Sequence, residues 1–338
     1  MRMAESSTNA KIPFKKINLG NVLERIKPLI DSGYIGLGNV VFDFEKKLAE
    51  YSGARFAVAV DSCTSALFLS AKYEYEKKGL RLVRVPSMTV PLALNAMLEA
   101  GLKVVLDDRH QWIGKYYQMM GSSIFDSAHE VRRNQFRYLK DHGAPDDLKL
   151  CYSFYPTKTI GSADGGAILT DDEEFAKWAK SAATYGRNQG NKYQNSWDYD
   201  VEMIGYKRHY TNLQAAICLE QLERLDETNA KRQAIMRRYN EAFKYNNDSD
   251  YLFRLNMTNK DEFIEYALEQ GIECGVHFKP LHKMTPFVTL PMTKEAKAEC
   301  EDAYSKTVSL PFYDTMTPEE VERVIDCVLS FKKGEILV

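Results

Sequence analysis

Several features that would mark a membrane, secreted or repeat protein are missing from the sequence. It has no run that approaches the ~20 apolar residues needed to span a bilayer. Residues 1–14 lack the apolar stretch of a secretory signal, so we expect a protein that stays in the cytoplasm. Internal repeats and low-complexity tracts are also absent, which argues against solenoid and fibrous architectures.

Paired cysteines and an excess of one charge are missing as well. The six cysteines include no C-x-x-C pair, which is typical of reduced core residues and not of disulfides or a zinc site. The formal net charge at pH 7 is only −2, so there is no electrostatic reason to expect nucleic-acid binding. With 338 residues, 44% hydrophobic and 27% charged, the chain has the composition of an ordinary globular protein.

The order of apolar patterns predicts an α/β protein. Helical spacing at 21–34 and 40–53 is followed by strand patterns that alternate with helices; the strands are expected at 56–60, 80–87, 103–108, 122–130, 148–158 and 165–172. Because these strands show no clear apolar–polar alternation, we expect a buried, mostly parallel sheet sandwiched by helices.

A second, smaller unit is predicted in the C-terminal part. One long helical pattern runs from 211 to 244 and is expected to bridge two domains. The patterns that follow predict strand, helix, strand, strand and helix, at 251–256, 260–271, 274–280, 308–312 and 317–333. We therefore expect a large domain over 1–212, and a bridging helix with a small α+β domain over 213–338.

Polar clusters stand where four of the predicted strands end, at 61–65, 87–89, 126–129 and 153–158. In open α/β sheets, ligands bind beside the carboxyl ends of the strands, so these clusters are expected to share one edge. Each cluster, taken alone, has more than one interpretation.

Three of these clusters hold groups that suit one cofactor. The motif DSCTSAL fits a helix N-terminus that binds a phosphate, or a helix that Ser62 or Thr64 merely caps. Asp126 in SSIFDSAHE is suited to keeping a heteroaromatic nitrogen protonated, or it caps a helix. Lys158 in CYSFYPTK is a solvated charge at a sheet edge, or a nucleophile toward an aldehyde. A phosphate cradle, an acid and a lysine are together the parts that pyridoxal 5′-phosphate (PLP) requires.

The same motifs, in the same order, resemble those of the DegT/StrS-type sugar aminotransferases, PLP enzymes of fold type I. The matching stretches also include VPSMT, GYKRHY and GVHFKPLH, and together they span nearly the whole chain. The resemblance implies an aminotransferase that moves an amino group, usually from glutamate, to a keto-sugar attached to a nucleoside diphosphate. Products of this kind feed surface polysaccharides, glycans or glycosylated natural products.

The resemblance also implies roles for single residues. Lys158 would hold the cofactor covalently and move the substrate's proton, and Asp126 would pair with the pyridinium nitrogen. His129 would lie against one face of the ring. The phosphate would be held by Thr64, Ser65 and Ser153.

A homodimer with composite active sites is implied as well. Lys207 in GYKRHY would reach the phosphate of a second copy of the chain, as the corresponding loop of relatives does. The residues implied in substrate binding are Tyr155, Arg187 and His277. The guanidinium groups of Arg187 and Arg208 suit a diphosphate or the carboxylate of glutamate.

Two departures from the family pattern stand out. Val90 replaces the aromatic residue that often follows P-x-x-T and stacks on the cofactor ring. Only RHQWIGKYYQMMG separates Asp108 from Ser122, where relatives have a whole strand–helix unit. Since a βαβ crossover needs about a dozen residues or more, we expect one strand–helix unit to be trimmed near 108–122. The sheet then either lacks a strand or builds one from KYYQMMG.

Three other functions stay open at this point. A PLP sugar dehydratase of the same fold carries histidine in place of the lysine, so Lys158 argues against it. An aminotransferase acting on a cyclitol or another keto-polyol is compatible with the same motifs, because the substrate pocket is built from loops. A non-catalytic or regulatory member of the fold agrees with the trimmed unit and Val90, but it has no need for Asp126 and Lys158.

Overall fold

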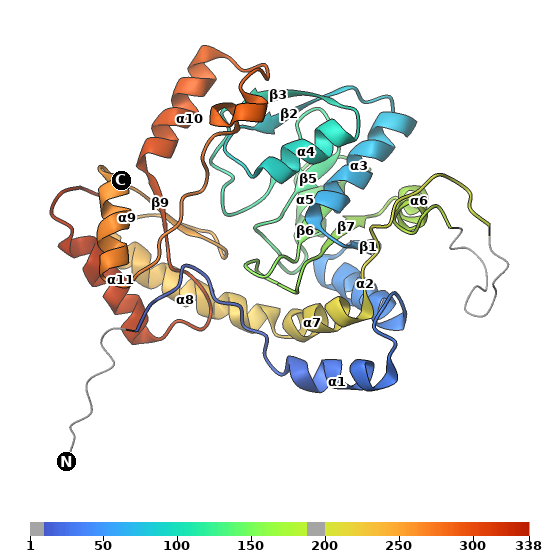
Figure 1. Ribbon diagram of the computed structural model, residues 1–338, viewed down its shortest axis with the longest axis horizontal. Coiled ribbons are helices and arrows are strands. Elements are labelled where there is room, and N and C mark those ends of the chain that lie inside the picture. The colour runs from blue at the N-terminus through green and yellow to red at the C-terminus, as the bar shows by residue number, and fades with distance from the viewer. Residues whose placement is uncertain (1–9, 188–199, 338) are drawn as a thin grey trace.

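The N-terminal half of the molecule is built around a sheet with helices on both faces (Figure 1). The structure, a computed structural model, describes residues 10–187 and 200–337; the start of the chain at 1–9, considered above for a secretory signal, lies outside them. The strands are β1 Phe56–Val60, β2 Leu82–Pro86, β3 Lys103–Asp107, β4 Tyr117–Gln118, β5 Ile124–Asp126, β6 Lys149–Ser153, β7 Gly166–Thr170, β8 Phe253–Asn256 and β9 Thr307–Leu310. The α-helices are α1 Val22–Ser32, α2 Asn39–Ser52, α3 Cys63–Lys77, α4 Pro91–Glu99, α5 Gln135–Asp141, α6 Glu173–Ala183, α7 Asn212–Glu223, α8 Leu225–Phe243, α9 Lys260–Glu269, α10 Lys294–Lys306 and α11 Pro318–Ser330.

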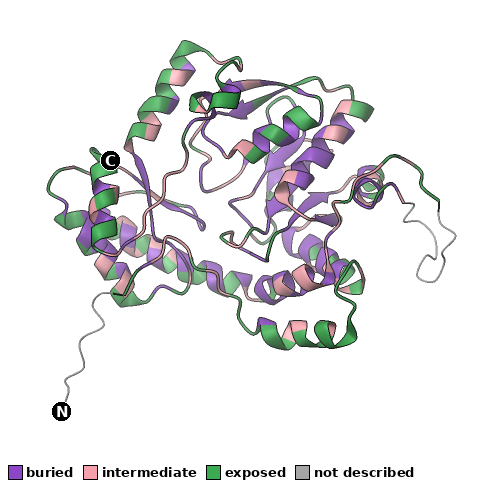
Figure 2. Ribbon diagram, in the orientation of Figure 1, coloured by how far each residue is buried: buried purple, intermediate pink, exposed green. Residues whose placement is uncertain are grey.

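Successive side chains of the central strands enter two separate cores. Val58, Cys151 and Ile168 pack with α3, α4 and α6 on one face of the sheet. Their strand neighbours, such as Leu150 and Leu169, pack with α2, α5 and α7 on the other. Because both faces are buried, the strands show no apolar–polar alternation in the sequence, and the predicted sandwich of helices is confirmed (Figure 2).

The direction of the strands corrects one expectation. The main sheet has the order β1-β7-β6-β5-β4, and β2 and β3 form a separate parallel pair. β7 is antiparallel to both of its neighbours, and β4 is antiparallel to β5. The sheet is therefore mixed and not mostly parallel. The connection from β6 to β7, residues 154–165, contains no helix, so the chain turns back and pairs in the antiparallel sense.

The trimmed connection between β3 and β5 builds a short strand. β4, within KYYQMMG, pairs with β5, and Met120 just after it forms an antiparallel bridge to Arg84 of β2. The segment thus lies between the main sheet and the β2–β3 pair and links them. The sequence left open whether the sheet lacks a strand or builds one from KYYQMMG, and the structure shows that it builds one.

The C-terminal part has its own core. The antiparallel pair β8–β9 packs with α8, α9 and α11, and Ile12 near the start of the chain joins this cluster. The predicted long helix is two helices, because the backbone at Arg224 leaves helical geometry (φ −106°, ψ 5°). The division into domains at 212/213 stays a prediction.

Two further corrections concern elements of secondary structure. The predicted strand at 274–280 makes only one bridge, between Gly275 and Ser309, and then crosses to the end of β2, where Leu281 N–H donates to Ser87 O. Helices α5, α6 and α10 were not predicted, although Asp172 and Thr293 cap α6 and α10 in the usual way. No helix of the described residues has the length and apolar character that a membrane crossing requires.

Candidate functional site

The ends of three strands meet at one edge of the sheet. β5 and β6 are parallel, and Asp126 at the end of β5 lies opposite Cys151. Val60 at the end of β1 and Ser153 at the end of β6 both pair with Gly166, the first residue of β7. Three of the predicted polar clusters therefore lie together, as the rule for strand ends led us to expect.

The N-terminus of α3 forms a cradle of hydrogen-bond donors beside this edge. Ser62 caps the helix by accepting a hydrogen bond from Ser65 N–H at 3.1 Å. Arg208 Nη1 donates to Ser65 Oγ at 3.1 Å, and its other terminal nitrogen pairs with Glu99 at 2.5 Å. Thr64 lies half-buried in the first turn of the helix. Hydroxyls, helix N–H groups and a guanidinium are the donor set that a phosphate requires.

Glycine is needed where β7 begins against this cradle. A Cβ on Gly166 would lie 2.5 Å from the backbone nitrogen of Cys63 and 2.6 Å from the carbonyl carbon of Ser62. Any side chain would push the strand away from the helix N-terminus. Gly166 thus serves the close approach of β7 to α3.

Asp126 is a buried acid with few partners. Its Oδ1 accepts from Ala128 N–H at 2.9 Å, and its Oδ2 accepts from the hydroxyl of Tyr117 at 2.9 Å. Burial raises the pKa of Asp126, while the two hydrogen bonds and the charge of Lys158 oppose that shift. A carboxylate held in this way gains from a cationic neighbour, and a pyridinium nitrogen is such a cation.

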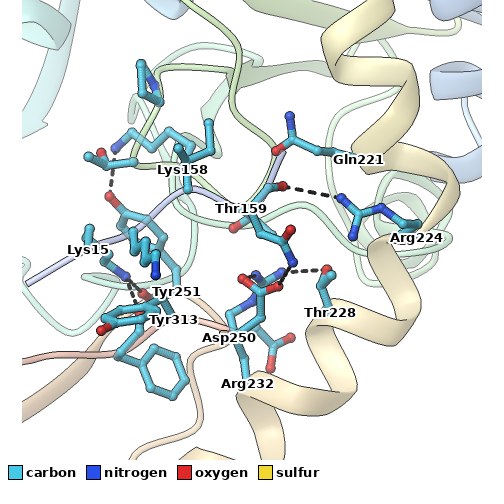
Figure 3. Close-up of a pocket in the computed structure, with 17 residues that line it drawn as sticks. Lys15, Lys158, Thr159, Gln221, Arg224, Thr228, Arg232, Asp250, Tyr251 and Tyr313 are labelled. Carbon is cyan, nitrogen blue, oxygen red and sulfur yellow. Dashed lines mark hydrogen bonds and ion pairs between the residues drawn. The ribbon is translucent and has the colours of Figure 1, made fainter. Parts of the chain in front are cut away.

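Lys158 lies in the loop after β6, close to Asp126. Its Nζ donates to the hydroxyl of Tyr251 at 3.3 Å, and Lys158 forms no ion pair with a carboxylate of the described residues. Figure 3 shows Lys158 reaching toward that hydroxyl, with Lys15 beside the same ring. The two ammonium groups lie 4.9 and 4.3 Å from the centre of the Tyr251 ring. Lys158 is therefore close to the buried acid and is not neutralised by an ion pair.

His129 stands inside a group of aromatic rings. The centre of its ring lies 4.5 Å from that of Tyr251, 5.3 Å from Trp112 and 5.7 Å from Phe278. Its Nδ1 accepts from Gly114 N–H at 3.1 Å, which leaves the proton on Nε2. Burial, then the charge of Lys158, lower the pKa of His129 well below its usual value. The imidazole is thus neutral, as a group that lies against a flat ring can be.

His277 belongs to the same group of rings. Its ring lies 6.4 Å from that of His129, and its Nδ1 lies 2.8 Å from Ser309 Oγ. Burial, followed by the charges of Lys15 and Lys158, lowers the pKa of His277 to about 3. The structure therefore brings together Lys158, Asp126, His129 and His277, which come from three different segments.

Three further predicted residues are placed differently. The carbonyl of Tyr155 accepts from Lys158 N–H at 2.9 Å, but its residue surface is 52% exposed. Arg187 is bridged to Val201 and approaches the hydroxyl of Tyr185. Lys207 is exposed on a segment that pairs with Thr184, and it is Arg208 that reaches the cradle of the same chain. Their predicted roles stay predictions.

A pocket open to solvent adjoins Lys158 on the side of α7 and α8. Its charged lining comprises Lys15, Lys16, Lys158, Arg224 and Arg232, against Asp250 and Asp314. Burial lowers the pKa of Lys15 well below its usual value, but the other four basic groups still outnumber the two carboxylates, which makes this a site suited to an anion. Arg232 is held from within α8 by Thr228 and Asn229 and lies 3.5 Å from Asp314.

Several residues at the site carried no signal in the sequence. Tyr251 lies 93 positions after Lys158 in a loop, and Lys15 belongs to the segment before α1. Trp112 and Tyr117 come from the trimmed connection, whose course no pattern specified. For such residues only the fold itself, or a set of related sequences, reveals the contact.

The chain is similar to known proteins over nearly its whole length. The relatives that the chain matches include the spore coat polysaccharide biosynthesis protein SpsC of Bacillus subtilis, which is 28% identical over 92% of this chain and 94% of that protein. A UDP-4-amino-4,6-dideoxy-N-acetyl-beta-L-altrosamine transaminase of Campylobacter jejuni is 26% identical over 88% of this chain and 92% of its own. The structure of AtS13 from Actinomadura melliaura has the same fold, with a TM-score of 0.79, 21% identity, and coverage of 95% and 99%.

The family model that matches the chain describes the DegT/DnrJ/EryC1/StrS aminotransferase family. It covers residues 19–115 and 124–329, and its interruption at 116–123 coincides with β4 and the turn after it. The match includes the cradle, the buried acid and the lysine. The chain therefore belongs to the DegT/DnrJ/EryC1/StrS aminotransferase family.

Proposed function

We propose that this protein uses PLP to transfer an amino group from glutamate to the keto group of a sugar carried on a nucleoside diphosphate, within amino-sugar biosynthesis. Membership of an aminotransferase family supports the reaction class. The observation that carries the proposal is the meeting of Lys158 with the buried carboxylate of Asp126, beside a helix N-terminus rich in donors. The family relatives that are named as transaminases act on nucleotide-linked amino sugars.

The residues of the site fit PLP. Ser62, Ser65 and Arg208 offer donors to a phosphate, which would replace the carboxylates of Asp61 and Glu99 as their partner. Asp126 offers the ring nitrogen a carboxylate whose burial makes a cationic partner favourable. PLP, when bound, supplies an electron-withdrawing ring that stabilises negative charge on the substrate carbon.

Lys158 is the residue that we propose to hold the cofactor and to move a proton. Its Nζ has one described hydrogen-bond partner, the hydroxyl of Tyr251, which orients the amine without neutralising it. A general base acts only within hydrogen-bonding reach of the proton that it moves, so this orientation matters. Neutral His129 and His277 add ring surfaces near the amine without adding charge.

The positive pocket supports an anionic substrate. A nucleoside diphosphate and the two carboxylates of glutamate are both anions, and guanidinium groups bind diphosphates and carboxylates in a bidentate way. Arg224 and Arg232 line this pocket next to Lys158. A cyclitol or another uncharged keto-polyol offers no such partner for these cations.

We further propose a homodimer in which Lys207 completes the phosphate site of the second copy. Large apolar side chains are exposed in and after α1, including Tyr34 at 79%, and near Lys207, where Ile204 is 95% exposed. Exposed apolar groups that gather in this way are typical of an interface. All six cysteines are free, in agreement with a reaction that takes place in the cytoplasm.

The test of the reaction is a visible spectrum of the protein with PLP, before and after the addition of glutamate. We expect a yellow, lysine-bound form that borohydride traps on Lys158 and that glutamate bleaches. Incubation of the bleached protein with nucleotide-linked keto-sugars and, in parallel, with keto-cyclitols should restore the yellow form only with the former. Absence of the yellow form, or trapping on another lysine, would contradict the aminotransferase function.

Mixing two variants tests the shared site. Lys158→Ala and Lys207→Ala should each be poorly active alone. After subunit exchange, hybrid dimers carry one site with both lysines intact, so activity should recover to about a quarter of the wild-type value. If mixing restores nothing although the chains exchange, Lys207 does not act across the interface.

A further inference from the structure

The trimmed connection between β3 and β5 contributes a residue to the site. Residues 116–123 fall outside the match to the family, and β4 lies within them. β4 is antiparallel to β5, and its register sets Tyr117 directly opposite Asp126. Residues that oppose each other in an antiparallel pair project to the same face, so the phenol is brought to the carboxylate by the pairing itself.

The contact between these two side chains is well defined. The Tyr117 hydroxyl donates to Asp126 Oδ2 at 2.9 Å and lies 3.4 Å from Thr89 Oγ1. Tyr117 is only 4% exposed, and the centre of its ring lies 4.3 Å from that of Trp112, another residue of the trimmed connection. Packing on Trp112 and the pairing with β5 fix the phenol in place.

The hydrogen bond runs from the phenol to the acid. Burial, then the charge of Asp126, raise the pKa of Tyr117 well above its usual value, so the phenol stays protonated and can only donate to a carboxylate. The other ionisable groups that face Asp126 are Lys158, Cys63 and Cys151. Burial raises the pKa of both thiols, so they stay neutral and place no negative charge beside Asp126.

We propose that Tyr117 is a positioning residue, which holds the carboxylate of Asp126 ionised and aimed at the ring nitrogen of the cofactor. The inference rests on the proposed use of PLP. It explains how the chain keeps a competent acid although the strand–helix unit of its relatives is missing: a two-residue strand supplies a donor at the position where the carboxylate needs one.

A pair of neighbouring variants tests this role. Tyr117→Phe removes the hydroxyl and keeps the ring, while Tyr116→Phe makes the same change one residue earlier. Tyr116 is the matched control, since its ring packs near that of Phe125 at 6.3 Å and lies in the other core. For each protein, PLP binding is titrated by absorbance between pH 5 and 9, and the apo protein is melted to check its folding.

The loss of the hydrogen bond should raise the pKa of Asp126, because the bond favours the ionised acid. We expect Tyr117→Phe to bind PLP about tenfold more weakly at neutral pH, the value of one hydrogen bond to a charged group. The acid limb of its binding curve should move upward by about one pH unit, since ionised Asp126 is lost at a higher pH. Tyr116→Phe should match the wild type in both respects.

The outcomes separate this inference from the proposed function. If the wild type fails to bind PLP, the proposed function is wrong and the role of Tyr117 falls with it. If the wild type binds PLP and Tyr117→Phe has the same affinity and the same acid limb, only the positioning role is wrong. Tighter binding by Tyr117→Phe would also overturn it, because the phenol would then be occupying space that the cofactor needs.

Discussion

Two lysines stand at opposite ends of β6, and their surroundings differ in an instructive way. Lys149 begins the strand and is completely buried, and its ammonium donates to Glu74 Oε1 at 2.7 Å, Ser123 Oγ at 2.8 Å and Asp147 O at 3.0 Å. Lys158 follows the end of the strand, and its side-chain amine has one hydrogen bond within the described part of the chain, to Tyr251. One lysine has a partner for every donor, and the other has donors to spare.

The difference separates a structural lysine from a reactive one. A buried charge whose donors are all used contributes to the fold and is closed to chemistry. An amine with free donors near a buried acid keeps the capacity to bind a ligand, at some loss of stability. Stability should therefore depend on the Lys149 end of the sheet, and activity on the Lys158 end.

The largest effect is expected from Lys158→Ala. Without the amine there is no covalent hold on PLP and no group to move the proton, so activity should fall by about 10³-fold or more. The melting temperature of the apo protein should hardly change, because no ion pair is lost. Borohydride trapping with peptide mapping and a melting curve check both statements.

Lys16 serves as the control for that variant. It lines the same pocket but is exposed, and no role in the chemistry is assigned to it. Lys16→Ala should still be trapped on Lys158 with PLP. Loss of trapping in both variants, with both folded, would mean that the pocket's charge and not the amine of Lys158 governs the attachment.

The next effect is on stability, at the other end of the strand. Lys149→Met leaves the carboxylate of Glu74, itself 5% exposed, without its cation, and should lower the free energy of unfolding by about 3–5 kcal/mol. Denaturant unfolding measures the change. Glu74→Gln combined with Lys149→Met should recover part of it, because no buried charge is then left unpaired.

The exposed pair of Lys177 and Glu173 provides the contrast. The same change, Lys177→Met, removes a solvent-exposed ion pair on the surface of α6 and should leave the free energy of unfolding almost unchanged. If Lys149→Met is as mild as Lys177→Met, the interpretation of Lys149 as a structural anchor is wrong.

The surroundings of Lys158 could largely be predicted from the sequence, whereas those of Lys149 could not. Asp126, Ser153 and Lys158 follow strand ends, and strand ends of one sheet meet at one edge, so their meeting was predictable from apolar runs. The partners of Lys149 lie on α3 and on loops far along the chain, and no local pattern specified them.

Contacts that depend on loops could not be predicted for the same reason. The direction of β7 follows from a connection without a helix, and the contact of Tyr117 with Asp126 from a two-residue strand too short to show a period. The break at Arg224 has no glycine or proline to mark it. Tertiary packing decided these features, whereas apolar spacing decided the main helices and strands.

The smallest expected effect is on the stability of the apo protein when Asp126, near Lys158, is replaced. The folded protein favours protonated Asp126, since burial raises its pKa above the ordinary value of about 3.9. Stability is therefore lost as pH rises from that ordinary value through the higher pKa of the folded state. Asp126→Asn carries no such charge, and Tyr117 can turn its hydroxyl toward Thr89 and accept from the new amide.

Apo Asp126→Asn should thus be more stable than the wild type by on the order of 1 kcal/mol at pH 7.5, and equal to it near pH 3. Addition of PLP should reverse the order, because only the ionised acid gains from the pyridinium. Melting curves at the two pH values, with and without PLP, measure the stability difference between variant and wild type under each of the four conditions. Asp141→Asn, at an exposed position at the end of α5, should show no such difference under any of them. A variant less stable than the wild type at pH 7.5 would mean that Asp126 supports the fold, as Lys149 does, and that the two ends of β6 do not divide stability from function.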